Sequence, residues 1–141
     1  MTLHPERLDQ PLRWRKPRMI FTCSMADLFH EKVPDEFIAG VFRTMKMAHQ
    51  HTFQILTKRP ERMKSFVGPW NITNAWPWLP NVWLGVSVEN QRWADHRIPM
   101  LLTTPAAVHF VSCEPLLGPL DLRKWLRPPI YSADEGTQSY E

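Results

Sequence analysis

The chain reads Phe53-Gln54-Ile55-Leu56-Thr57-Lys58-Arg59-Pro60-Glu61-Arg62 near its middle, where a short apolar run is followed at once by two cations and a proline. Short apolar runs bounded by polar residues are typical of buried strands, and proline is favoured at the first position of a helix. This segment therefore predicts a strand, a polar loop and the beginning of a helix.

Three other segments, 20–27, 82–90 and 108–115, repeat an apolar run that ends in polar residues. Continuous apolar runs are typical of parallel strands covered on both faces, and helical segments between the runs would supply the cover. The sequence thus predicts an α/β fold of about four parallel strand-helix units. The carboxyl ends of parallel strands share one edge, where ligands bind. We expect the following ligand-binding candidates to converge there: Asp27, Lys58, Arg59, Glu89, Asn90 and Glu114.

Two interpretations of this edge remain open. In the first, Lys58 and Arg59 bind a phosphate or carboxylate, while the acids and Asn90 accept hydrogen bonds from hydroxyl or amine groups of a ligand. In the second, the two cations only neutralise Glu89 and Glu114.

Length and composition indicate one domain with its own core, since the 141 residues are 43% hydrophobic and 22% charged. The 14 prolines lie mostly between the periodic segments. We expect strands at 19–24, 52–57, 82–88 and 107–112. Helices are expected from Pro34 to 48, at 60–67 until Gly68-Pro69, at 93–102 with a kink or early end at Pro99, and at 120–126. The domain then spans 19–126, between an extended proline-rich arm at 1–18, with at most a short turn at 5–9, and a polar, disordered tail at 127–141.

A net charge of +3 permits an anionic partner without requiring one. Four cations, Arg13, Arg15, Lys16 and Arg18, surround Trp14. This cluster suits phosphate contact with base stacking, or is simply a solvated approach to the first strand.

Several smaller patterns favour structural roles. The spacing of Asp27 and His30 suits an acid/base or metal pair, but no third ligand is near, so capping is the alternative. A histidine pair, His49 and His51, precedes a strand at its amino end, which favours structure. The tryptophan-rich segment 70–81 is expected to cover one end of the sheet.

No run approaches the ~18 apolar residues of a membrane span, and the first residues lack the layout of a signal peptide. We expect a cytoplasmic protein without a membrane partner, in which Cys23 and Cys113 are buried thiols rather than a disulfide.

Five motifs in order resemble the bacteriophage gp thirty-seven/gp sixty-eight family, over roughly residues 3 to 126. They are His4-Pro5-Glu6-Arg7-Leu8, Leu28-Phe29-His30, Leu56-Thr57-Lys58-Arg59-Pro60-Glu61-Arg62-Met63, Gly85-Val86-Ser87-Val88-Glu89-Asn90-Gln91 and Cys113-Glu114-Pro115-Leu116-Leu117-Gly118. That family is similar to radical-S-adenosylmethionine barrels and distantly to spore-photoproduct-lyase-type repair proteins. The resemblance implies a partial TIM-type barrel of uncharacterised role, related to nucleic-acid or nucleotide-like substrates.

Full-length relatives carry an upstream three-cysteine motif of the kind that ligates a [4Fe–4S] cluster, used with S-adenosylmethionine, and they continue past the last motif. We therefore expect this chain to be a fragment or a natural truncation. Its two cysteines are 90 positions apart, whereas cluster ligands are closely spaced, so we expect no cofactor and no cluster-dependent catalysis in this chain. The alternative function is a non-enzymatic nucleic-acid- or protein-binding or assembly module, which self-associates through open sheet edges.

Overall fold

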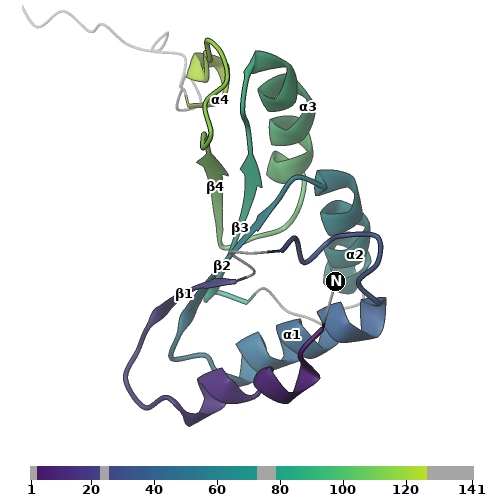
Figure 1. Cartoon of the computed structure of the whole chain (residues 1–141), viewed down its shortest axis with the longest axis vertical. Coiled ribbons are helices and arrows are strands. Elements are labelled where there is room, and N and C mark those ends of the chain that lie inside the picture. The colour runs from purple at the N-terminus through teal and green to yellow at the C-terminus, as the bar shows by residue number, and fades with distance from the viewer. Residues whose placement is uncertain (1–2, 23–25, 73–78, 127–141) are drawn as a thin grey trace, which may run out of the picture.

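A computed structural model describes residues 3–22, 26–72 and 79–126. After two 3-10 helices, η1 (Pro5–Arg7) and η2 (Gln10–Arg13), strands and helices alternate (Figure 1). The elements are β1 (Met19–Thr22), α1 (Asp35–Met47), β2 (Thr52–Thr57), α2 (Pro60–Ile72), β3 (Val82–Ser87), α3 (Gln91–Leu102), β4 (Val108–Ser112) and α4 (Arg123–Leu126). The expected tail at 127–141, Cys23 and residues 73–78 of the tryptophan-rich segment lie outside the described residues.

The four strands form one parallel sheet in the order β1-β2-β3-β4, which confirms the predicted α/β fold of parallel strand-helix units. Each strand pairs with the next one in the chain. Crossovers between parallel strands are right-handed, so sequential pairing places the connecting helices on the same side of the sheet. Figure 1 shows α1, α2 and α3 together on one side.

The two faces of the sheet differ in burial. On the helix-covered face, Phe53, Ile55 and Thr57 of β2 are buried, and the residues between them are only partly buried. The opposite face exposes Met19, Phe21 and Val108, at 61%, 44% and 37%. The expectation that both faces are covered is therefore wrong for the described residues, because the sequential crossovers bring α1, α2 and α3 to one side.

Helix α1 supplies much of that cover. It begins after Pro34, carries Asp35 and Glu36 in its first turn, and ends at Met47, as expected. Its apolar positions are spaced at helical intervals, and the buried ones are Ile38, Val41, Phe42 and Met45. The predicted core face of this helix is confirmed.

Prolines interrupt two helices less than expected. Helix α2 continues past Gly68 and Pro69 to Ile72, and α3 continues past Pro99 to Leu102. A proline near the end of a helix removes one backbone hydrogen bond, and the turn that follows still closes, as when Thr103 N donates to Pro99 O at 3.2 Å. The predicted end at Gly68-Pro69 is wrong.

The N-terminal arm is more structured than expected, because its two 3-10 helices replace a mostly extended path. It is fastened to the domain through His51, whose side chain is 1% exposed. Arg18 N donates to His51 Nδ1 at 3.2 Å, so Nε2 carries the ring proton and donates to Pro11 O at 2.9 Å. His51 thus has the structural role that its place before a strand indicated.

Candidate functional site

A pocket of about 220 Å³ opens where β1, β2 and β3 end. We call it the carboxyl-end pocket. Its lining residues are Phe21, Ala26, Asp27, Leu56, Thr57, Lys58, Arg59 and Ser87. Three strand ends therefore contribute to one concave surface, at the edge where parallel α/β folds bind ligands.

Asp27 is the centre of one half of this site. Its Oδ1 accepts from Phe29 N at 3.0 Å and from Thr57 Oγ1 at 2.7 Å. Its Oδ2 accepts from Lys58 N at 3.1 Å and from Arg59 Nη1 at 2.9 Å. Asp27 therefore joins the loop after β1 to the loop after β2, and its side chain is only 14% exposed.

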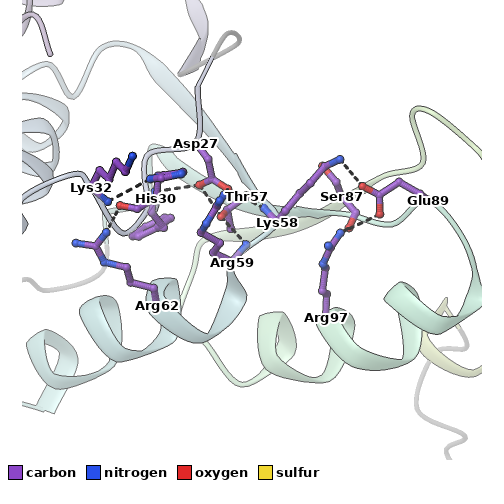
Figure 2. Close-up of polar contacts among 11 residues, drawn as sticks. Asp27, His30, Lys32, Thr57, Lys58, Arg59, Arg62, Ser87, Glu89 and Arg97 are labelled. Carbon is purple, nitrogen blue, oxygen red and sulfur yellow. Dashed lines mark hydrogen bonds and ion pairs between the residues drawn. The ribbon is translucent and has the colours of Figure 1, made fainter. Parts of the chain in front are cut away.

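Glu89 is the centre of the other half. Its Oε1 lies 2.5 Å from Lys58 Nζ, and its Oε2 accepts from Arg97 Nη1 at 2.9 Å. The same nitrogen of Arg97 donates to Ser87 O at 2.7 Å, while the guanidinium lies 4.2 Å from the centre of the Trp93 ring. Figure 2 shows Lys58 extending toward Glu89 and Arg59 toward Asp27.

The electrostatics keep Glu89 charged. Burial is the largest influence and raises its pKa, but the hydrogen bond from Lys58, a backbone hydrogen bond and the charges of Arg97 and Lys58 together outweigh it. The pKa of Glu89 is consequently below its ordinary value. The charged Glu89 and the carboxyl group of Asp27 together have three cationic partners, Lys58, Arg59 and Arg97.

The carboxylates are less exposed than the cations that bind them. Glu89 is 7% exposed and Asp27 14%, whereas Lys58 is 51% and Arg59 41% exposed. Solvent and small ligands thus meet the cations first. Helix α2 begins directly after Arg59, and the unpaired amides of a helix N-terminus also favour negative charge.

A third arginine fixes the wall beside the pocket. Arg62, on the first turn of α2, bonds His30 O and Val33 O in the loop after β1. Its Nη2 also lies 2.7 Å from Asp35 Oδ1. The loop that carries Asp27 is therefore held to α2 at several points.

A family model described as "Protein of unknown function (DUF5131)" matches residues 1–129. The chain belongs to the DUF5131 family. Neither a curated protein nor a solved structure matches it.

Four of the six expected site residues of this DUF5131 chain come together: Asp27, Lys58, Arg59 and Glu89. Asn90 instead caps α3, because its Oδ1 accepts from Trp93 N at 3.2 Å. Glu114 is exposed and makes no ion pair among the described residues. In the second interpretation of this edge, the cations pair with Glu89 and Glu114; Lys58 does pair with Glu89, but Arg59 pairs with Asp27.

Asp27 and His30 do not form an acid/base pair. Asp27 caps the local turn through Phe29 N, and His30 Nδ1 accepts from Lys32 N at 3.1 Å. Within the described ranges, no group of three or more histidine, cysteine or acidic side chains is arranged to hold a metal ion. The hydrogen bond from Phe29 N is the capping contact of the alternative interpretation of Asp27.

Sequence reasoning missed two residues that support the site, Thr57 and Arg97. Thr57 continues the buried positions Phe53 and Ile55 at every second residue, which marked it as inward-facing. Arg97 occupies the buried face of α3 with Ala94, Ile98 and Leu101. Arg97 is a cation at a core position of an amphipathic helix, and this position could have predicted that it pairs with a buried carboxylate such as Glu89.

Proposed function

We propose that the carboxyl-end pocket binds the phosphate group of a nucleotide-like ligand, with Lys58 and Arg59 as its cationic contacts. The observation that carries this proposal is that the buried Glu89 and the largely covered Asp27 both keep other partners if these cations turn away. Asp27 would retain Thr57 Oγ1 and two backbone N–H groups, and Glu89 would retain Arg97. If the half-exposed side chains of Lys58 and Arg59 turn toward a ligand, no buried charge is therefore left without a partner.

The size of the pocket limits what enters it. Drug-sized ligands occupy about 300–1,000 Å³, and this pocket offers about 220 Å³. That volume suits a phosphate and an adjoining group rather than a whole nucleotide. The base of such a ligand would extend beyond the residues that line the pocket.

Isothermal titration with inorganic phosphate and with adenosine 5′-monophosphate tests the proposal. The double variant Lys58→Ala/Arg59→Ala should lose binding. A matched control is Arg123→Ala/Lys124→Ala, which removes two cations of α4, 81% and 60% exposed. Unchanged binding in the pocket variant, equal loss in the control, or no binding by the unaltered protein would each refute the phosphate site.

We further propose that the four strands form part of a TIM-type barrel, similar to that of radical-S-adenosylmethionine proteins, in a chain of the bacteriophage gp thirty-seven/gp sixty-eight type. The sequential strand order and one-sided helices support it, since (β/α)₈ barrels have both. The face that carries Phe21 would then be turned toward the barrel interior.

The cysteines of this chain do not fit a [4Fe–4S] cluster. Cys113 is partly buried, and the only other cysteine of the sequence is 90 positions away, whereas a cluster needs several closely spaced thiolates. We therefore assign no radical step to these residues. Anaerobic iron–sulfur reconstitution of this chain should give no cluster absorbance, and a cluster spectrum would overturn that assignment.

Self-association is a second candidate function, favoured by the exposed apolar side chains of Met19, Phe21 and Val108 on the uncovered sheet face. β1 and β4 are the edges of the described sheet. Two copies that join β4 to β1 at both seams would close eight strands and cover these side chains. Size-exclusion chromatography with light scattering should give a dimer, and Phe21→Lys should give a monomer. A monomer at high concentration would exclude this assembly.

A further inference from the structure

The positive charge of the chain is concentrated in its N-terminal arm. The whole sequence has 17 Lys and Arg against 14 Asp and Glu. Residues 1–18 contain five basic and two acidic residues, so they account for the whole excess of +3. The rest of the chain is balanced. Within this segment, the cations that follow η1 are Arg13, Arg15, Lys16 and Arg18, which we call the basic arm.

The backbone of the basic arm is held in place before any partner binds. In addition to the two bonds of His51, Gln50 Nε2 donates to Trp14 O at 3.3 Å, and Thr52 N donates to Arg18 O at 2.9 Å. The purple N-terminal segment lies beside α1 in Figure 1, where Leu8 is close to Gly40. A partner therefore meets an ordered segment, and binding costs less conformational entropy.

Trp14 positions a cation instead of offering a stacking surface. The guanidinium of Arg18 lies 4.7 Å from the centre of the Trp14 ring, and the ring of His51 approaches it edge-on with centroids 5.9 Å apart. A base could stack on the ring face that Arg18 covers only by displacing Arg18. Phosphate contact by the cations, in contrast, needs no free face of the Trp14 ring.

The four cations are unequally engaged. Arg13 Nη2 lies 2.6 Å from Asp9 Oδ2, so its charge is partly neutralised. Arg15 and Lys16 are exposed and have no ion-pair partner in the described part of the chain. With Arg18, about three charges are available to an anion.

We propose that the basic arm is a second anion-binding surface, which contacts the phosphate backbone of a nucleic acid without reading its sequence. It lies where the chain enters β1, at the amino ends of the strands, and so at the opposite end of the sheet from the carboxyl-end pocket. The proposal does not depend on ligand binding in that pocket.

The reach of the basic arm fits a phosphate backbone. Arg18 lies five positions after Arg13, a stretch of chain that spans at most about 18 Å. At 3.4 Å of duplex axis per phosphate of one strand, that length matches about five phosphates. Three of the four cations are arginines, whose planar forks bind phosphate in a bidentate manner.

A nucleic acid fits this surface better than an anionic membrane does. Trp14 is only partly exposed, and Leu12 is the one large apolar side chain exposed between residues 3 and 18 of the described chain, at 38%. A single leucine gives a lipid interface little apolar surface to bury.

Fluorescence anisotropy with a labelled 20-base-pair duplex and a labelled 20-nucleotide single strand, at 50 to 200 mM salt, tests the proposal. With about three phosphate contacts, log K against log salt should have a slope of about −2.7 for the duplex, a loss of roughly 40-fold over that range. Arg15→Ala/Lys16→Ala should weaken binding about tenfold or more at 100 mM salt and make the slope shallower by about two.

A matched double variant serves as the control, because it also removes two cations. Arg123→Ala/Lys124→Ala should change the affinity less than twofold. Equal weakening in the two double variants would mean that net charge alone accounts for the effect, and it would overturn the proposal. So would unchanged binding in Arg15→Ala/Lys16→Ala, absence of binding at 50 mM salt, or binding to vesicles with 30% phosphatidylserine but to neither oligonucleotide.

Discussion

Glu89 and Arg97 form a buried ion pair, with 2.9 Å between Oε2 and Nη1 and with 7% and 6% of the two side chains exposed. Removing one partner from such a pair leaves the other charge buried, which costs about 3–5 kcal/mol. Arg97→Ala should therefore lower the free energy of unfolding by about 3 kcal/mol, toward the low end because Lys58 still reaches Glu89. Urea denaturation measures this change.

An exposed pair is the appropriate comparison. Arg123 lies 2.6 Å from Asp121, but its side chain is 81% exposed. Arg123→Ala should change stability by no more than about 1 kcal/mol. If Arg97→Ala were equally mild, the Glu89–Arg97 pair would not stabilise the strand-helix unit of β3 and α3.

The lowered pKa of Glu89 makes stability depend on pH in the acid range. A carboxyl whose folded pKa is depressed contributes stability that is fully present above its unfolded pKa, about 4.3 for glutamate. That contribution decreases as the pH falls below about 5 and is lost once the pH passes below the folded pKa. Urea midpoints from pH 7 to pH 3 should therefore fall less steeply for Glu89→Gln than for the unaltered protein.

Asp95 provides a control for this pH dependence. Its pKa is also lowered, by hydrogen bonds from Lys124 and Gln91, but its side chain is 47% exposed, and solvent weakens such interactions. Asp95→Asn should leave the acid decline almost unchanged. A decline that is as steep in Glu89→Gln as in the unaltered protein would mean that other carboxyls control acid unfolding.

Much of the fold could be predicted because its signals are local. The segment 52–57 alternates buried and partly buried residues, and it lies between a histidine and a pair of cations. Both the strand and the loop that follows it could therefore be predicted. What lies over the second face of the sheet depends on non-local packing. The apolar character of Phe21 and Val108 indicated that these side chains are buried. No local sequence pattern indicates whether a helix of the same chain or another molecule covers them.

The sequence predicted which residues of the site lie close together, but it predicted less well which of them form ion pairs with one another. Strand-end position alone placed Lys58, Arg59 and Glu89 near one another. The partner of Arg59 depends on how the loop after β1 folds back, because Asp27 must reach both Thr57 Oγ1 and Lys58 N. A single sequence carries no direct record of that loop geometry.

The hydrogen bonds of Asp27 can be tested by replacing its charge at constant size. In Asp27→Asn, one oxygen becomes an NH₂ group that faces Thr57 Oγ1 or the N–H donors of Lys58 and Arg59. We expect a loss of about 2–3 kcal/mol, since hydrogen bonds to charged groups are worth about 1.5–3 kcal/mol each. Thr57→Val should cost about 1 kcal/mol.

The double variant Asp27→Asn/Thr57→Val shows whether these two side chains act together. Their atoms are 2.7 Å apart, so the two losses should not add, and the coupling should exceed about 0.5 kcal/mol. Chemical denaturation of the four proteins in this cycle provides the measurement. Simple additivity would contradict a direct bond between the loops after β1 and β2.

Gly85 leaves room for the ring of Phe110 on the uncovered face of the sheet. The two residues are register partners in β3 and β4, and a Cβ at Gly85 would lie 2.5 Å from Phe110 Cζ. Gly85→Ala should therefore force the ring aside and cost about 1–3 kcal/mol, as overpacking does.

In a Phe110→Ala background the added methyl meets no ring, so the same substitution should be neutral or slightly stabilising, because alanine restricts the unfolded chain. Thermal or urea unfolding of the two single variants and the double variant gives the coupling between the sites. An equal cost of Gly85→Ala in both backgrounds would mean that the ring does not occupy this position in solution.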